Sequence, residues 1–409
     1  MHDQPPCVRP GAATPRTVLA ETHGDQMKRR RRPTKLVVTL VLAVSLSAAL
    51  ATASNAAPKS LPYGAIVRPA PNTLAVIGRP PNEEQGEADI ANAVLYRGRD
   101  TLYVIDSGAT PSFRPFLRRA IRRLRPFRKV VLINTHGHPD HFGNNALITG
   151  IDAPVVRHFM SRRDFRLADD YLRVSLRVTF RRLSGYLPGL SDPDAQARSE
   201  LDLFRPLRQS VGTRRAIESL PTQRVAIGRL RTHGWKLGGN DVVLLRTAGH
   251  TPGELIVYFP KTRLLHTADE TVAYYPAFPE ASPAHTQRFF TRAIAAAGGD
   301  DVQVLTDGHT HSILRGAGPI RRRFRSFLDG YDAYDRVVKR LLRAAAPDGA
   351  TVGELMAGIA RSPALRRAPG GAPAPGVFSA LQVLKKLRQL HAVSTGGPRA
   401  TRRFRLPSR

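Results

Sequence analysis

Three histidines and an aspartate stand within six residues of one another, and this cluster restricts the fold more than any other feature of the chain. It lies in the sequence NTHGHPDHFGN, directly after segment 129–133, which we expect to be a short buried strand. A loop that leaves a strand can turn alternate side chains toward one point. His136 and His138 can therefore hold one metal ion, while Asp140 and His141 face a second position. Imidazole and carboxylate ligands without thiolates suit zinc in a catalytic site.

Three more metal-competent side chains follow predicted strands later in the chain, namely His250, Asp269 and His309. Each stands beside small residues that let the backbone approach closely. Any one of them alone would be an ordinary strand-end residue. Together with the first cluster they predict a site for two metal ions.

The remaining sequence predicts alternating strands and helices around this cluster. We expect strands at 73–77, 91–96, 101–105, 129–133, 241–246, 255–259, 263–266 and 302–305, and helices at 112–124 and 286–297. A helical insertion is expected from His158 to Leu220, and the chain is expected to be helical after Gly318, with a small helical tail from Thr351 to Leu390. Two similar halves of this kind indicate an α/β protein in which packed sheets carry helices outside.

The ligand pattern resembles the metallo-β-lactamase superfamily of metallohydrolases over about residues 60–330. The resemblance implies an αββα sandwich with the metal ions at one edge of the two sheets. It implies that the first zinc ion is held by His136, His138 and His250, the second by Asp140, His141 and His309, and that Asp269 bridges them. It also implies a supporting role behind the ligands for Asp106.

Within the superfamily, the local sequence is nearest to the secreted alkylsulfatase branch. The resemblance rests on TAGHTPGE at 247–254, on YFP at 258–260 and on PAFP at 276–279. The chain departs from that branch, which usually has glutamates at the positions of His250 and Asp269. The arginine expected after the Phe-Pro element is not clearly present, and Glu280 stands there instead.

These motifs predict a zinc-dependent metallohydrolase that cleaves an ester-type bond of a small-molecule substrate, an anionic one if the alkylsulfatase likeness extends to the substrate. Two zinc ions would share a bridging hydroxide, which attacks the substrate while the catalytic residue Asp140 orients it. His311, Tyr274 and Tyr275 are candidates for proton donation or substrate contact, and packing in the wall of the site is the alternative for each. A lactone or β-lactam hydrolase is an alternative function. A metal-dependent oxidoreductase or a non-catalytic binding protein on the same fold is an alternative of another class.

The charge of the chain adds an expectation about the substrate. The formal net charge is +31, and its arginines are scattered rather than gathered on one face with aromatic residues. We therefore expect no nucleic-acid partner, although a winged-helix interpretation of 351–393 would predict one. Arginines at 157, directly before the expected insertion, and at 162, 163, 181 and 182 within it would favour an anionic ester if they point inward.

The N-terminal segment 1–56 predicts export. A basic run after Met27, an apolar stretch from Leu36 to Leu50 and small residues up to Ala56 form a leader and secretory signal peptide. The expected mature protein is periplasmic or extracellular, without a stable membrane anchor. It would comprise a hydrolase domain at 57–330 and a helical extension at 331–409, and the extension could form a homodimer or cover the site.

Overall fold

A computed structural model provides the structure of the chain. It describes residues 60–78, 91–109, 111–149, 151, 154–161, 163–164, 181, 183, 185–186, 223–227, 230–276, 280–298, 301–369, 371–373 and 377–407. The expected signal peptide, and all but a few residues of the expected insertion after 164, lie outside these ranges.

The first sheet has six strands in the order β1-β2-β3-β4-β5-β6. They are β1 (Ile66–Val67), β2 (Thr73–Val76), β3 (Ala93–Arg97), β4 (Thr101–Ile105), β5 (Lys129–Ile133) and β6 (Val155–Phe159). The strands β4, β5 and β6 are parallel, so the loops that follow them leave from the same edge of the sheet. The connections carry η1 (Pro111–Phe113), α2 (Arg114–Arg123), η2 (Pro139–His141) and α3 (Asn145–Thr149).

The second sheet has seven strands in the order β13-β12-β11-β10-β9-β8-β7. They are β7 (Gln223–Ile227), β8 (Leu230–Leu237), β9 (Val242–Arg246), β10 (Leu255–Phe259), β11 (Leu264–His266), β12 (Val304–Thr306) and β13 (Leu314–Arg315). The short helix η5 (Ala268–Thr271) follows β11, and α7 (Pro283–Gly298) lies between β11 and β12. Helix α8 (Ala317–Ala344) comes after the last strand.

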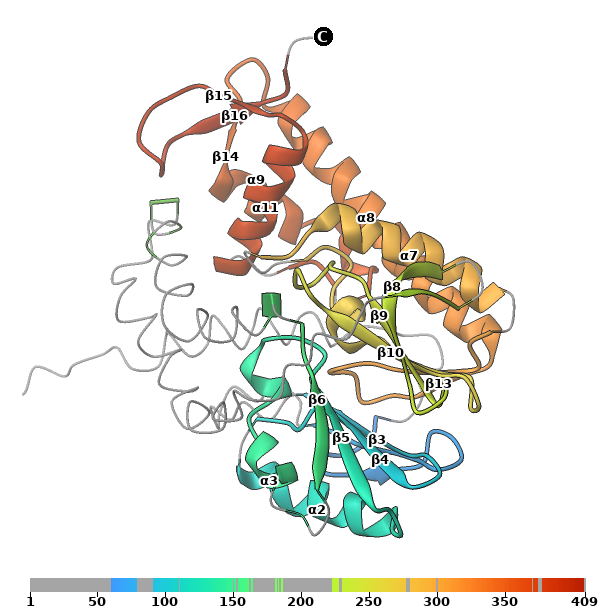
Figure 1. The fold of residues 1–409 in the computed structure, drawn as a ribbon. Helices are drawn as coiled ribbons and strands as arrows, with labels where there is room; N and C mark the ends of the chain where they lie inside the picture. The colour runs from blue at the N-terminus through green and yellow to red at the C-terminus, as the bar shows by residue number, and fades with distance from the viewer. Residues whose placement is uncertain are drawn as a thin grey trace, which may run out of the picture.

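The domain has four layers, which are held together by buried apolar side chains. Figure 1 shows the two sheets between their helices. Between the sheets, Ile105 and Ile133 of the first pack with Val257 and Phe259 of the second. The outer face of the first sheet is covered by α2, and the outer face of the second by α7 and α8. Because each sheet and each helix is apolar on the side that faces its neighbour, the layers bury one another. The αββα sandwich predicted from the sequence is confirmed.

The C-terminal part of the chain combines helices with a third, small sheet (Figure 1). It comprises β14 (Ala350–Thr351), α9 (Val352–Ala360), α10 (Pro363–Arg366), α11 (Val377–Gln389), β15 (Val393–Ser394) and β16 (Arg403–Arg405). Helix α9 begins with a capping box, in which Thr351 Oγ1 accepts from the Glu354 amide at 3.2 Å and the Glu354 carboxylate accepts from the Thr351 amide at 2.7 Å. The expected helical tail therefore has helices, but it also has strands that were not predicted.

Other sequence-based boundaries also differ from the structure. The sequence predicts that the insertion begins at His158. In the structure His158 belongs to β6, and its buried ring lies 2.6 Å from Asn134 Oδ1. Strand β6 continues there because it pairs with β5 and extends the buried sheet. The sequence does not predict strands β7 and β8, since only Leu230, Gly234 and Leu237 of β8 are buried and this spacing is not the alternation typical of a strand. Helix α8 runs across the boundary expected at 330–331, because one continuous apolar face packs on the second sheet.

Within the part of the chain that the structure describes, no helix combines the length and the apolar character that crossing a membrane requires.

Candidate metal centre

The His-rich loop after β5 is held rigidly by polar contacts behind it. Asp106, at the end of β4, accepts hydrogen bonds at 2.8 Å from the Thr135 amide and from Thr135 Oγ1, and its Oδ2 lies 2.8 Å from His141 Nδ1. Asn134 Nδ2 donates to the His141 carbonyl at 3.0 Å. Since Asp106 is fully buried, its carboxylate fixes the loop and leaves Nε2 of His141 facing the centre.

All seven side chains predicted as ligands lie together at this edge of the sandwich. They form two groups, the first made of His136, His138, His250 and Asp269 and the second of Asp140, His141 and His309. In each group the candidate ligand atoms lie within 4.8 Å of one another, and every residue is buried. The division follows the two ligand sets expected from the sequence.

Asp269 lies between the two groups. Its Oδ2 is 2.9 Å from His309 Nε2, 3.4 Å from His250 Nε2 and 3.7 Å from His136 Nε2, while its Oδ1 is 3.4 Å from His141 Nε2. One carboxylate thus faces histidines of both groups, as a bridging ligand must.

The donor set fits zinc. Nδ1 of His138 lies 3.0 Å from Nε2 of both His136 and His250. Nitrogen ligands at 2.0–2.1 Å around a tetrahedral zinc ion stand about 3.3 Å apart, so these three rings are already near ligand spacing. Among the described residues, the buried atoms His141 Nε2 and Asp269 Oδ1 have no hydrogen-bond partner, and a bound cation would satisfy both.

The electrostatics of the cluster favour the metal-binding protonation state at three of the candidate ligands, His136, His250 and Asp269. Burial, with the neighbouring histidines, lowers the pKa of His136 and His250 well below the usual range, so both rings are neutral. Burial opposes ionisation of Asp269, but His309, His141 and His136 outweigh it and hold the pKa of that carboxyl well below its usual value. Metal ions bind neutral imidazole and ionised carboxylate, so His136, His250 and Asp269 are prepared for them. At His141 and His309 burial is outweighed by the nearby carboxylates, Asp269 foremost, which raise the pKa, so a metal ion must displace a proton from these two rings.

Two buried glutamates behind the ligands were not predicted as functional. Glu254 accepts from the His250 amide at 3.1 Å and from the Asp269 amide at 3.0 Å, while Glu270 accepts from the Gly249 amide at 2.8 Å. Burial, together with the Glu270 charge, raises the pKa of Glu254 well above its usual value. One sequence signal could have found the pair: each acid stands within four residues of a predicted ligand.

Two further carboxylates approach the ligand loops from outside. Glu280 Oε1 lies 2.7 Å from His138 Nε2. Asp164, at the start of the region expected to be an insertion, accepts from Thr251 Oγ1 at 3.0 Å and from the Gly253 amide at 3.2 Å. Both contacts join segments far apart in the sequence, so no local pattern could predict them.

The three candidate proton donors differ in how deeply they are buried. Tyr275 packs in the core with its ring stacked on Tyr334, and its hydroxyl donates to Gln389 at 3.4 Å. The Tyr274 hydroxyl is buried and finds no hydrogen-bond partner in the part of the chain that the structure describes, and burial raises its pKa well above the usual value. Both rings belong to the core cluster that packs the second sheet against α7 and α8. His311 is partly exposed two residues after the ligand His309, and stays a candidate.

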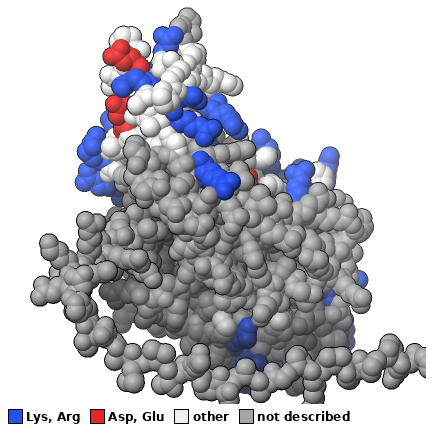
Figure 2. All heavy atoms as spheres, turned by 90° about the vertical axis from the view of Figure 1, so that its left-hand side faces the viewer, with Lys and Arg blue, Asp and Glu red and all other residues white. Residues whose placement is uncertain are grey.

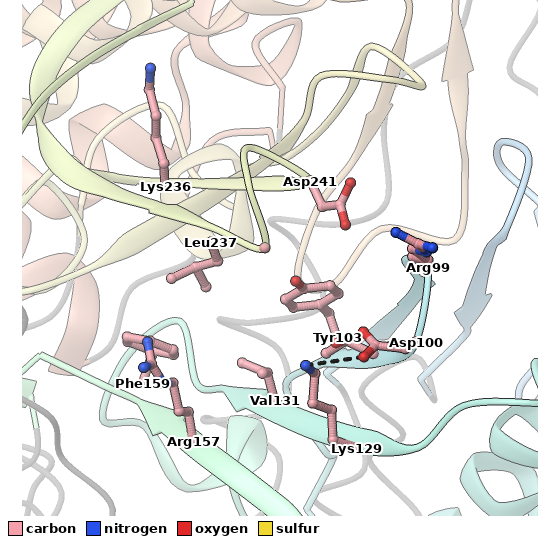
Figure 3. Close-up of a pocket in the computed structure, with 12 residues that line it drawn as sticks. Arg99, Asp100, Tyr103, Lys129, Val131, Arg157, Phe159, Lys236, Leu237 and Asp241 are labelled. Atoms are coloured by element: carbon pink, nitrogen blue, oxygen red, sulfur yellow. Dashed lines mark hydrogen bonds and ion pairs between the residues drawn. The ribbon is translucent and has the colours of Figure 1, made fainter.

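A cavity of about 590 Å³ lies at the opposite edge of the sandwich from the metal-competent residues. Its lining includes Thr101 and Lys129 at the starts of β4 and β5, whereas the metal centre follows the ends of these strands. Figure 3 shows Lys129 among the side chains that line the cavity. Lys129 there forms a 3.1 Å ion pair with Asp100. Arg157, expected to contribute to substrate selection, lines this cavity and so lies at the edge away from the metal centre.

A two-sheet sandwich with histidines and aspartates gathered at one edge defines a class of metal-binding protein, and comparison with known families specifies it. Residues 86–286 match the family model of the metallo-beta-lactamase superfamily, so the chain contains a domain of that superfamily. The resemblance inferred from the ligand pattern is confirmed. Members of this superfamily are mostly metal-dependent hydrolases.

Solved structures show the same fold at low sequence identity. A beta-lactamase domain protein from Burkholderia ambifaria is 20% identical with a TM-score of 0.55, and the alignment covers 85% of this chain and 97% of that one. A metallo-beta-lactamase family protein from Thermus thermophilus is 17% identical with a TM-score of 0.51, covering 78% and 94%. The stereoselective inverting sec-alkylsulfatase from Pseudomonas sp. is 17% identical with a TM-score of 0.53, covering 80% of this chain and 50% of that one. A search of curated proteins by sequence gave no match.

Proposed function

We propose that the protein is a secreted hydrolase that uses two zinc ions to cleave an ester-type bond in an anionic small molecule. The observation that supports this best is the gathering of seven buried metal-competent side chains into two groups with Asp269 between them. A structural zinc site needs four ligands and closes around one ion. Seven ligands around two positions favour catalysis instead.

The positions of the residues in the centre suggest a role for each in hydrolysis. When bound, two zinc ions would polarise the scissile group and make water a nucleophile near neutral pH. Asp140 has the most exposed side chain of the seven, at 12%, and its Oδ2 lies 3.5 Å from His309 Nε2. Its carboxylate can accept a hydrogen bond from a water molecule at the centre and orient it toward the substrate. Asp106 and Glu254 keep the ligand loops in place for this step.

An anionic substrate is supported by the charge of the protein and by one structural neighbour. The chain carries a formal charge of +31, and basic side chains gather on the described part of the face shown in Figure 2. Such a surface attracts anions over distances comparable with the Debye length. An alkylsulfatase also appears among the proteins with the same fold.

Export is part of the proposal and rests on the sequence of residues 1–56. We expect the protein recovered outside the cytoplasm to begin after Ala56. N-terminal sequencing of that protein tests the expectation. Protein found entirely in the cytoplasm with residues 28–56 intact would contradict it.

The hydrolytic function is tested with zinc-loaded protein and matched substrate pairs. An alkyl sulfate and a carboxylate-bearing ester are compared with a neutral ester of equal length, a lactone and a β-lactam. We expect faster turnover of the anionic esters and a smaller preference at high salt. Preference for the lactone or the β-lactam would favour that alternative. Zinc binding without any hydrolysis would contradict a hydrolase and favour a binding protein, whereas native iron with redox activity would indicate an oxidoreductase.

A further inference from the structure

Helix α11 of the C-terminal part is anchored on the segment that leads to Glu280. Gln382 Nε2 donates to the Tyr275 carbonyl at 2.7 Å, and Lys385 Nζ donates to the Ala281 carbonyl. The helix thus binds the backbone on both sides of Glu280. Its position is fixed from beneath, since Ala380, Val383 and Leu387 are buried in the core.

The same segment is joined to the metal centre. Glu280 Oε1 lies 2.7 Å from His138 Nε2, and the Ser282 amide donates to the Gly249 carbonyl at 2.7 Å, next to the ligand His250. Residues 280–282 therefore contact both of the loops that supply histidines to the first group. The side chain of Glu280 is nearly buried, at 9% exposure, so water screens its contact with His138 little.

The contact of Glu280 determines which nitrogen of His138 is available to a metal ion. A carboxylate at Nε2 favours the tautomer with the proton on that atom. Nδ1 then carries the free electron pair, and Nδ1 is the atom 3.0 Å from Nε2 of His136 and of His250. Groups that orient ligand histidines in this way contribute to metal affinity.

Lys385 is placed to hold the Glu280 segment both by its hydrogen bond and by its charge. Burial lowers the pKa of Lys385 to about 8, and the Glu280 carboxylate opposes this effect by favouring the charged amine.

We propose that Glu280 is the positioning residue for His138 and that Lys385 on α11 holds Glu280 in place, so that the C-terminal part of the chain helps to build the first metal site. The inference rests on the metal-binding part of the proposed function and is independent of any substrate. Unlike a recognition helix for nucleic acid, α11 directs Lys385 inward, and Lys386 pairs with Asp335 beside Tyr275 and Tyr331.

The test measures metal affinity on the full chain. Metal-free protein is titrated with zinc in competition with a chromophoric chelator, and with cobalt while its absorption spectrum is recorded. We expect Glu280→Ala to weaken binding of one metal equivalent by about 10- to 100-fold and to change the cobalt spectrum. Glu280→Gln, which keeps an acceptor oxygen but loses the charge, should lie between Glu280→Ala and the wild type.

Variants of α11 test the role of the helix. Lys385→Met should weaken binding of the same metal equivalent by less than Glu280→Ala does. Lys385→Arg should keep most of the wild-type affinity. Arg388→Met removes an exposed cation of the same helix and is the matched control, with wild-type affinity expected. A merely structural lysine would change the thermal unfolding of the metal-free protein without changing the affinity or the spectrum.

Two results would overturn the inference. Wild-type affinity and an unchanged cobalt spectrum in both Glu280 variants would exclude a positioning role for Glu280. Equal affinities of Lys385→Met and Arg388→Met would exclude the role of α11. If Glu280→Ala does not fold, the zinc affinity and the cobalt spectrum of Glu280→Gln decide whether Glu280 positions His138. A wild-type protein that takes up no metal refutes this inference together with the proposed function, whereas one that binds metal but hydrolyses nothing refutes the function alone.

Discussion

Replacing Asp106 by asparagine tests how the fold prepares its ligands. The Asp106 carboxylate accepts three hydrogen bonds, two from Thr135 and one from His141 Nδ1. An asparagine has the same size, but only one of its terminal atoms is an acceptor. If its oxygen keeps the bond from the Thr135 amide, its NH₂ group faces His141 Nδ1, which must then become an acceptor. The proton of His141 would move to Nε2, the atom that faces the metal centre.

The structure sets the size of the expected effect. Loss of a partner that orients a ligand histidine costs about 10- to 100-fold in metal affinity. At about 1.4 kcal/mol per factor of ten, this is roughly 1.4–2.8 kcal/mol at the second site. The metal-free protein should also lose about 1.5–3 kcal/mol of unfolding free energy, because a hydrogen bond to a buried charged group is lost.

Zinc competition and urea unfolding of the metal-free protein measure the two quantities separately. Asp100→Asn is the matched control, because Asp100 is 47% exposed and pairs with Lys129 at the far edge of the sandwich. A surface pair of this kind contributes at most about 1 kcal/mol, so no change in zinc affinity is expected. Asp106→Asn protein that binds two zinc equivalents as tightly as the wild type would refute the reasoning.

Three further predictions concern the same centre. Purified protein should contain about two zinc equivalents by elemental analysis, and removal with a chelator should lower the melting temperature, because an ion that binds only the folded state stabilises it. Asp140→Asn should leave circular dichroism unchanged and lower turnover by about 10²-fold or more, since the group that orients water is weakened; near wild-type turnover would show a wrong assignment. Burial raises the pKa of Asp164 to about 7. The folded state therefore holds a proton that the unfolded state releases near pH 4, and this contribution to stability falls as the pH rises from about 4 to 7. Asp164→Asn should make urea unfolding less pH-dependent in that range, and identical pH profiles for variant and wild type would contradict the prediction.

The ligands could be predicted from the sequence because each belongs to a local pattern. His136 follows β5, His250 follows β9 and Asp269 follows β11, each within a few residues of the strand end. The edge of a sheet brings such loops together whatever the details of the connections between them. For this reason the residues of the ligand pattern carry the resemblance to a known family.

The missed features depend on contacts between distant segments. Glu280 and His138 are separated by 142 residues, and Lys385 and Ala281 by 104, so no periodicity relates them. The strands of the third sheet have two or three residues each, too few for an alternating pattern to be recognised. They exist because β16 pairs with both β14 and β15.

The position of α11 gives the C-terminal part a role that its composition does not suggest. Judged by charge alone, a helix with Lys385, Lys386 and Arg388 indicates a surface for acidic partners. In the structure Lys386 is 1% exposed and pairs with Asp335 of α8, while Lys385 reaches the backbone beside Glu280. Two of the three cations are therefore used inside the protein, which leaves Arg388 for solvent. The helix joins the second sheet's outer layer to the metal centre, and changes in its packing should reach the ligand His138 through Glu280.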